Sequence, residues 1–321
     1  MTPDRPPPVV LVVGAASRDI APDDPRGWRL GGAVTYSSLT LARLGLHVRA
    51  LVGVDRAAAT ATELDELRAA GVSVALAHLS SGPVFENIEA ADARRQRCLS
   101  AAETIARTAL PRMWTSGFDG LLLGPVAGEL PEDWALLAAG DPHPVVALGW
   151  QGLLRAVVAG HDVQRVPPRR DPLVAAAALV GSSRDDFAAD TAPEAAVALL
   201  SPGATLVVTE GQAGGLILER RGDAKRPVSS RYDAIPSDSA VDPTGAGDVF
   251  LAAMLAGRLQ PSLGDPLLIA AAAASLTVEA LGLAGVPDLA AVRRRATRAP
   301  SLDSRRPSAA SNLDSGRPSQ A

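Results

Sequence analysis

Short apolar runs alternate along the chain with segments of helical pattern. Residues 9–13 form a β-branched run that ends at Gly14, which indicates a buried strand. Further runs that predict strands lie at residues 48–52, 72–77, 121–123, 145–148, 176–180 and 206–208. Helices are expected at residues 37–44, 61–70, 266–281 and 288–296. This alternation predicts an α/β fold with a parallel sheet covered on both faces, and ligands beyond the carboxyl ends of its strands.

Two segments interrupt the alternation. Residues 17–30 and 83–97 carry polar residues where a helix would otherwise be expected. As strands outside the main sheet, they would form a small lid over a substrate. Residues 214–218, two glycines followed by an apolar run, predict a hairpin after the strand at 206–208.

The ends of the chain differ from its centre. Residues 1–8 are charged and proline-rich, and we expect them to be flexible. Residues 299–321 are rich in Ser, Pro, Arg and Ala, with too little apolar surface to offset the entropy of ordering, which predicts a disordered tail. A single domain over residues 9–298 is therefore expected, with lid segments at about 17–30 and 83–97.

Composition narrows the functional classes. Among 321 residues the net charge is −4, and basic residues form no block interleaved with aromatics, so a nucleic-acid partner is not expected. The start lacks the apolar core of a signal peptide, and no long uninterrupted apolar stretch predicts a membrane span. Cys98 is the only cysteine, so no intrachain disulfide can form. A cytoplasmic protein is the expectation.

The candidate chemistry lies in residues 241–250, Val-Asp-Pro-Thr-Gly-Ala-Gly-Asp-Val-Phe. Small residues before an apolar run predict a tight loop that opens a helix, where N–H groups and the helix dipole favour a phosphate. The N–H groups of Gly245, Ala246 and Gly247 would form the anion hole. Asp248 would accept the proton of a substrate hydroxyl, so the motif predicts phosphoryl transfer to an alcohol. No P-loop pattern is present, and Lys225 is the only lysine.

The run Asp-Pro-Thr-Gly-Ala-Gly-Asp-x-Phe resembles a signature of the ribokinase-like (PfkB) carbohydrate kinases. Other segments match this family in chain order and extend the resemblance over residues 9–297: Gly14-x-x-x-x-Asp19, Gly31-Gly32, residues 42–45, residues 208–214, and Ala274, Val278, Glu279 and Gly282. The resemblance implies a three-layer fold with a mostly parallel central sheet, helices on both faces and a small β lid.

The same resemblance implies roles for individual residues. Asp19, Gly31 and Gly32 would bind the acceptor. ATP would be bound by a second group of residues: Thr209, Gly211, Gly214, Ala274 and Val278. Asp242 would help to hold a monovalent cation such as K⁺, which related enzymes use near the anion loop.

Two departures from the family pattern affect these roles. Ser183-Arg184-Asp185-Asp186 replaces Asn-x-x-Glu, whose glutamate acts through water on the Mg²⁺ that accompanies ATP; Asp186 keeps a carboxylate there, and a solvated acidic turn is the alternative. Ala33 and Tyr36 replace the lysine and asparagine that help ribokinases to read ribose, so ribose is not the favoured acceptor.

The Tyr36 ring could instead stack on a sugar or cyclitol. The run around it is similar to a branch that includes inositol kinases, as are residues 85–87, 94–96 and 151–155. Asn87 and Arg95 are the candidate acceptor contacts in the lid, with exposed lid positions as the alternative.

The sequence thus predicts an ATP-dependent kinase acting on a sugar or polyol, a cyclitol such as inositol included. A nucleoside kinase on the same scaffold, a catalytically silent sugar-binding or regulatory protein, and a scaffold acting through its tail remain alternatives. An exposed lid strand could pair with a second copy, which makes a homodimer through the lid a further expectation.

Overall fold

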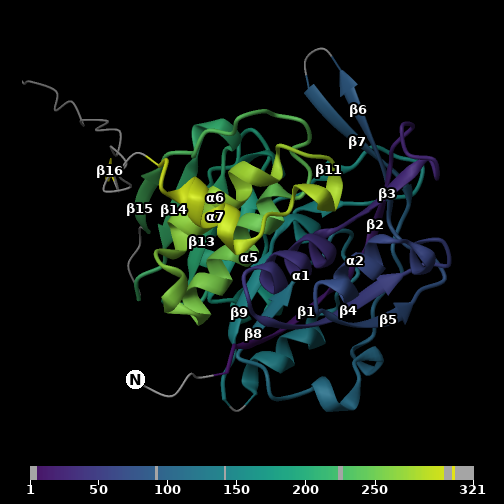
Figure 1. The fold of residues 1–321 in the computed structure, drawn as a ribbon, viewed down its shortest axis with the longest axis horizontal. Coiled ribbons are helices and arrows are strands. Elements are labelled where there is room, and N and C mark those ends of the chain that lie inside the picture. Colours follow the sequence, from purple (N-terminus) through teal and green to yellow (C-terminus); the bar gives the residue numbers. More distant parts are fainter. Residues whose placement is uncertain (1–5, 91–92, 141, 223–226, 300–305, 308–321) are drawn as a thin grey trace, which may run out of the picture.

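A computed structural model describes residues 6–90, 93–140, 142–222, 227–299 and 306–307. Its central sheet has the strand order β16-β15-β14-β13-β12-β9-β8-β1-β4-β5 (Figure 1). The parallel strands are β1 (Val9–Ala15), β4 (His47–Val54), β5 (Ser73–His78), β8 (Gly120–Leu123), β9 (Val145–Gly149), β12 (Leu179–Ser183) and β13 (Thr205–Thr209). At one edge the antiparallel strands are β14 (Gly215–Glu219), β15 (Val228–Tyr232) and β16 (Arg306–Pro307).

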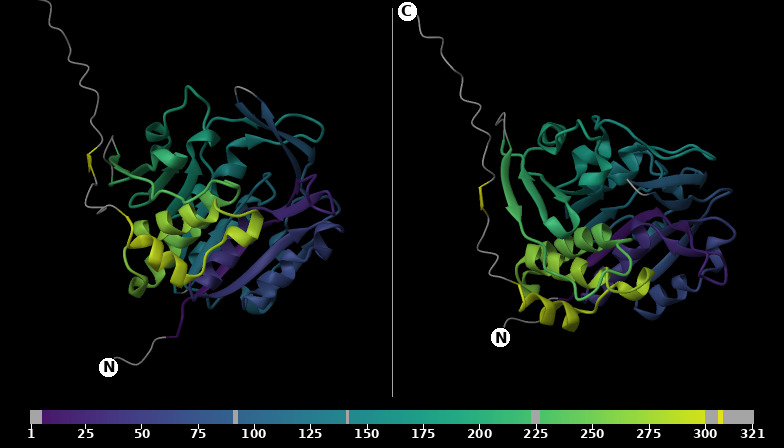
Figure 2. Two further views of the ribbon diagram at one scale, coloured as in Figure 1. Left: turned by 45° about the horizontal axis from the view of Figure 1, so that its top comes forward. Right: turned by 90° about the horizontal axis from the view of Figure 1, so that it is seen from above.

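Helices cover both faces of this sheet, which confirms the predicted fold class. Alternate side chains of β1 enter different cores: Val10 and Val12 pack on one face, Leu11 and Val13 on the other. The first core is covered by α1 (Ala33–Arg43), α2 (Glu63–Ala69), α5 (Ala246–Leu259), α6 (Pro266–Thr277) and α7 (Leu289–Ala296). The second is covered by shorter elements: α3 (Pro172–Ala176), α4 (Pro193–Ala196) and a 3₁₀ helix at Glu132–Ala139. Figure 2 shows α5 to α7, coloured from yellow-green to yellow, as one layer against the sheet.

The predicted starts of two elements need correction. Helix α1 begins at Ala33 rather than Ser37, since Gly32 with φ 95° forms its N-cap. Ala176 ends α3 instead of starting a strand, because Asp171 caps that helix and β12 begins only at Leu179. Further 3₁₀ helices occupy Ala58–Thr60, Arg107–Ala109, Arg112–Trp114, Gln151–Leu153, Arg184–Asp186, Val197–Leu199, Gly211–Ala213, Pro261–Leu263 and Gly282–Gly285.

A second, four-stranded sheet is formed by the two segments that interrupt the alternation. Its order is β3-β2-β6-β7, from β3 (Trp28–Gly31), β2 (Ser17–Ile20), β6 (Val84–Ala90) and β7 (Ala93–Ser100). Strands β6 and β7 extend away from the central sheet (Figure 1). A short pair, β10 (Arg155–Ala156) and β11 (Gln164–Arg165), lies beside β7, since Val163 N–H donates to Gln96 O at 2.8 Å.

Ion pairs attach the small sheet to the main body. Arg18 pairs with Asp55 at 2.6 Å, and Arg26 pairs with Glu63 at 2.7 Å. Glu63 is 8% exposed and also accepts a hydrogen bond from Leu30 N–H at 3.1 Å. Because Arg18 lies in β2 and Arg26 precedes β3, these pairs fix the orientation of the strand that carries Asp19.

The predictions for the two ends of the chain fall largely outside the described residues. Of the expected tail, the structure describes residue 299 and strand β16, which pairs with β15. The flexible start, the disordered tail and the domain limits stay predictions. Among the described helices, none is long and apolar enough to cross a membrane.

Helices α1 and α5 meet at Gly245. This glycine is the N-cap of α5, with φ 78°, in the left-handed region. A Cβ atom there would overlap the ring of Tyr36, which is 2% exposed in α1. The absence of a side chain therefore permits both the turn into α5 and the close packing of the two helices.

Replacing Gly245 by Ala should lower the free energy of unfolding by about 3 kcal/mol, from the left-handed backbone and the overlap with Tyr36. Gly247→Ala is the matched control, because a Cβ at Gly247 meets no atom within 4 Å. Denaturant unfolding of both variants measures the difference. Equal stability of the two would contradict the packing of Gly245 on Tyr36.

Candidate functional site

Two adjoining cavities lie at the carboxyl edge of the central sheet. The larger has a volume of about 680 Å³ and reaches from the small sheet to β12 and β13. The smaller, of about 560 Å³, lies between β15, the loop after it and α6. Their shared lining residues are Thr209, Gly211, Pro243, Ala246, Gly247, Phe250 and Val278. The first turn of α5 thus lies where the two cavities meet.

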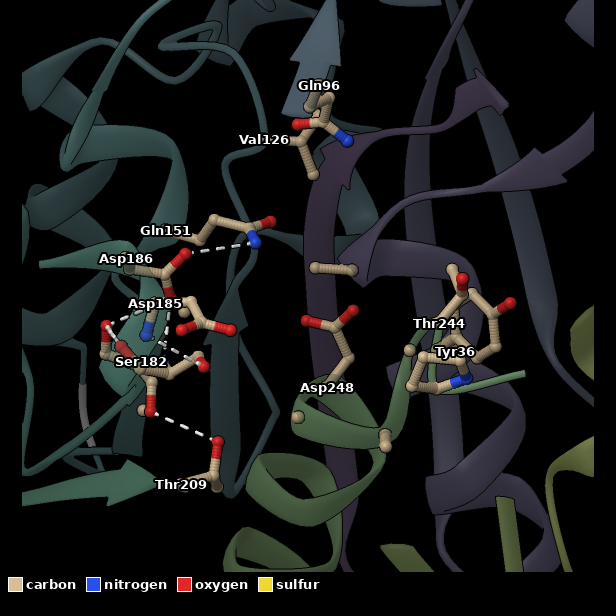
Figure 3. A pocket seen from close by; sticks show the side chains of 18 of the residues that line it. Tyr36, Gln96, Val126, Gln151, Ser182, Asp185, Asp186, Thr209, Thr244 and Asp248 are labelled. Carbon is tan, nitrogen blue, oxygen red and sulfur yellow. Dashed lines mark hydrogen bonds between the residues drawn. The ribbon is translucent and has the colours of Figure 1, made fainter. Parts of the chain in front are cut away.

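Asp248 lies in that first turn, and its carboxyl group points into the larger cavity (Figure 3). Burial raises the pKa of Asp248 to about 7, with additional repulsion from Asp186 and Asp19, while the positive charge of Arg155 acts in the opposite direction. A carboxyl group that ionises near neutrality suits a general base.

The loop before α5 brings its backbone to the same place. Gly245, Ala246 and Gly247 all line the larger cavity. Ala246 N–H donates to Pro243 O in a long bond of 3.3 Å, and the helix begins at this residue. The N-terminus of α5, a 14-residue helix, therefore faces the cavity, an arrangement that favours anions.

Five of the six predicted acceptor residues line the larger cavity: Asp19, Gly32, Tyr36, Asn87 and Arg95. Asn87 Oδ1 accepts a hydrogen bond from Gln96 Nε2 at 3.0 Å. Gly31 does not line the cavity. A Cβ at Gly31 would overlap Oδ2 of Asp19, so this glycine makes room for the carboxylate instead.

Tyr36 lines the cavity but does not offer the stacking face expected from the sequence. Its side chain is 2% exposed, because the ring packs against the backbone of Gly245. Figure 3 shows it beside the loop that carries Thr244. The ring supports that loop, and stacking on a sugar is not available to it.

The predicted nucleotide residues gather around the smaller cavity. Thr209 and Gly211 line both cavities, and Gly214 and Ala274 line the smaller one. Val278 lies at the end of α6 and lines both. The wall of the smaller cavity is largely apolar, with Tyr232 stacked on Phe250 at 5.4 Å between ring centres.

Asp186 is held in the larger cavity by three hydrogen bonds. Its Oδ2 accepts from Ser183 N–H at 2.8 Å and from Ser182 Oγ at 3.1 Å, while Oδ1 accepts from Gln151 Nε2 at 3.2 Å (Figure 3). Ser183 and Asp186 form a capping box, which gives the Ser-x-x-Asp spacing a local structural role. Asp185 lines the same wall.

These carboxylates suit a Mg²⁺ ion that keeps most of its water and phosphate ligands. Among the described residues, no cluster of three or more His, Cys, Asp or Glu side chains could hold a metal by itself. An ion carried with a nucleotide fits this donor set better than an ion caged by the protein.

Asp242 lines neither cavity. Its carboxylate accepts backbone N–H groups from Thr244 at 2.9 Å and from Gly282 at 3.2 Å. These bonds join the loop before α5 to the 3₁₀ turn after α6. The role of Asp242 in holding a monovalent cation stays a prediction.

Arg155 is a site residue that the sequence did not single out. It lines the larger cavity from β10, donates to Gln96 Oε1 at 2.9 Å and lies 5.8 Å from the ring centre of Phe85. Burial lowers the pKa of Arg155, and the nearby carboxylates of Asp186 and Asp248 oppose this effect. The sequence indicates only the Gln151–Arg155 segment, through its similarity to the inositol kinase branch, and no local pattern marks the arginine itself.

Comparison with known proteins shows which family part of the chain resembles and which solved structures share its fold. Residues 176–289 match the pfkB family carbohydrate kinases, and no curated protein matches the sequence. A pyrophosphate-dependent kinase in the ribokinase family, complexed with a pyrophosphate analog and myo-inositol, has a similar structure: the TM-score is 0.69 at 18% identity, over 89% of this chain and 99% of that one.

Two further solved structures show the same fold. The nucleoside kinase of Methanocaldococcus jannaschii gives a TM-score of 0.63 at 17% identity, over 91% of this chain and 98% of that one. Arabidopsis thaliana ribokinase complexed with ribose and ATP gives 0.62 at 18% identity, over 90% and 99%. Residues 176–289 are therefore similar to the pfkB family carbohydrate kinases, and the chain has a ribokinase-like fold.

Proposed function

We propose that this protein transfers the γ-phosphoryl group of ATP to a hydroxyl group of a sugar or polyol. The observation that carries the proposal is the position of Asp248. Its carboxyl group opens into the larger cavity one turn from the start of α5, where that cavity meets the smaller one. An acceptor in the larger cavity and a nucleotide in the smaller one would meet at this point.

In this proposal Asp248 accepts the proton of the attacked hydroxyl while its oxygen bonds to the γ-phosphorus. The acceptor is held by Asp19, Gly32, Asn87 and Arg95. The guanidinium of Arg155 adds a positive charge to the same cavity. The N–H groups of the loop before α5 stabilise charge on the transferred oxygens. Mg²⁺ held through water by Asp186 would neutralise phosphate charge.

The smaller cavity supports a nucleotide as the donor. Ile235, Pro236 and Ala274 contribute an apolar lining that suits a purine base. Inorganic pyrophosphate, the donor named for a similar structure, contains no group that would fill such a space. Gly211 and Thr209 lie between this cavity and the loop, on the path of the phosphates.

The larger cavity supports a polyol over a nucleoside as the acceptor. The aromatic residues in its lining are Tyr36, Phe85 and Phe250, and each is 2–3% exposed. A nucleobase would thus find no open ring to stack on among the described residues. The polar lining from Asp19, Asn87 and Gln151 instead offers hydrogen bonds to several hydroxyls.

The raised pKa of Asp248 argues against a catalytically silent protein. A partly buried carboxyl group whose pKa is raised destabilises the folded state at neutral pH, which is common where a residue is kept for catalysis. A binding protein would gain stability from a neutral residue there.

Incubation of the purified protein with ATP and Mg²⁺ against pentoses, hexoses, inositols and nucleosides tests the proposal. We expect ADP formation that depends on a sugar or inositol. Parallel reactions with K⁺ or with a bulky organic cation test whether activity needs a monovalent cation, which Asp242 would help to hold. Turnover of nucleosides alone would favour the nucleoside kinase, and no turnover of any acceptor would contradict the proposal.

Asp248→Asn should lower kcat by about 10²–10⁴-fold, because the variant lacks the general base. The same change should make the protein more stable above pH 4. The folded state of the wild type holds a proton on Asp248 up to about pH 7 that the unfolded state releases near pH 4, so its stability falls as pH rises between these values. Steady-state kinetics and thermal unfolding at pH 8 measure both effects. Wild-type turnover in this variant would remove Asp248 from its role.

The pH dependence of kcat/KM should show one acidic limb near pH 7, with activity rising as Asp248 loses its proton. Asp186→Asn should move this limb to lower pH, since it removes a repelling charge. Arg155→Met should move it to higher pH, since it removes an attracting one. Arg95→Met, at a residue 60% exposed in its side chain, serves as the control and should leave the limb in place. Shifts in the same direction for Asp186→Asn and Arg155→Met would contradict this electrostatic assignment.

A further inference from the structure

Arg295 in helix α7 is a buried arginine, 5% exposed, whose guanidinium makes four hydrogen bonds. Its Nη1 donates to Pro236 O at 3.1 Å and to Ser275 Oγ at 2.7 Å. Its Nη2 donates to Asp238 Oδ2 at 3.1 Å and to Glu279 Oε1 at 2.7 Å. One planar group therefore links two separate segments of the chain.

Those two segments are adjoining walls of the smaller cavity. Pro236 belongs to the loop at residues 233–245, and Ser275 belongs to α6; both line the cavity, whereas Arg295 does not. The walls also bond to each other directly. Ser275 Oγ donates to Pro236 O at 3.1 Å, and Asp238 N–H donates to Glu279 Oε1 at 2.6 Å. Arg295 lies behind both walls, and Figure 1 shows α6 and α7 side by side.

The loop needs such a support because it has no regular secondary structure between β15 and α5. A segment of this kind is held only by the contacts that its side chains and carbonyls make. Arginine suits the position because its donors form a rigid planar fork, which a lysine cannot reproduce. Without it, Pro236 O loses a charged donor, and Glu279 is left with an uncompensated charge at the end of α6.

We propose that Arg295 is a positioning residue that sets the separation of the two walls of the smaller cavity and thereby the affinity for the nucleoside part of the donor. This inference rests on the proposed use of a nucleotide. It assigns no contact between Arg295 and the ligand, since the arginine acts through Pro236 and Ser275. The phosphate end of the donor, bound at the loop before α5, should not depend on it.

Calorimetric titration of the whole protein with ADP and with inorganic tripolyphosphate separates the two ends of the donor. Arg295→Lys and Arg295→Met should each weaken ADP binding by about tenfold. Binding of tripolyphosphate, which has no nucleoside, should stay within about twofold of the wild type. A purely structural role would weaken both ligands together or neither.

Arg298→Ala is the matched control. Arg298 also contacts Asp238, at 3.1 Å, but its side chain is 64% exposed. Within the described part of the chain, its side chain bonds to no residue that lines the smaller cavity. Its removal should leave both affinities unchanged. Asp238→Asn is a second test that does not threaten folding, because Asp238 is 69% exposed in its side chain; it should weaken ADP by about threefold.

The outcomes distinguish this inference from the proposed function. Wild-type affinity for ADP in both Arg295→Lys and Asp238→Asn would overturn the role of Arg295 and leave the nucleotide donor intact. Equal losses for ADP and tripolyphosphate would also overturn it. A wild-type protein that binds tripolyphosphate but not ADP would overturn the nucleotide donor itself.

Discussion

The contact between Gly245 and Tyr36 determines where helix α5 begins and which way its first turn faces. Gly245 takes a left-handed conformation, and the buried ring of Tyr36 packs where its side chain would be. Helix α5 therefore starts at the carboxyl edge of the sheet, with its N-terminus and Asp248 both directed into the larger cavity. A helix end whose dipole favours anions and a carboxyl group with a pKa near 7 become neighbours through one backbone turn.

Three parts of the structure around this turn form different regions of the proposed site. The small sheet, fixed by the pairs Arg18–Asp55 and Arg26–Glu63, presents Asp19 to the larger cavity, where the acceptor is proposed to bind. Strand β12 ends in the capping box that holds Asp186. The loop at 233–245 and helix α6 enclose the smaller cavity. Because Asp19 and Asp186 both act on the ionisation of Asp248, acceptor binding and metal binding would be coupled to the proton transfer.

Sequence patterns were sufficient for the parallel sheet and for the helix start at residues 245–248. Apolar periodicity and the glycine cluster are local signals, and both describe backbone geometry directly. Sequence patterns were not sufficient to predict the role of Tyr36. Its ring could stack on a sugar or pack under Gly245, and the choice depends on a contact with a residue 209 positions away in the chain. Arg155 and Arg295 were missed for the same reason: their partners Gln96 and Pro236 are each more than 50 residues distant. The Ser183–Asp186 capping box is a local feature. The Ser-x-x-Asp spacing is visible in the sequence, but the sequence analysis related it only to metal binding or a solvated turn and not to a helix cap.

A crystal structure of the Asp248→Asn variant with a non-hydrolysable ATP analogue and Mg²⁺ tests the central claim most directly. The account predicts a γ-phosphate against the N–H groups of residues 245–247, with the base in the smaller cavity beside Ala274. The side chain at position 248 should face that phosphate across the space for an acceptor hydroxyl. A γ-phosphate bound away from the start of α5, or a residue 248 with no access to it, would contradict the account.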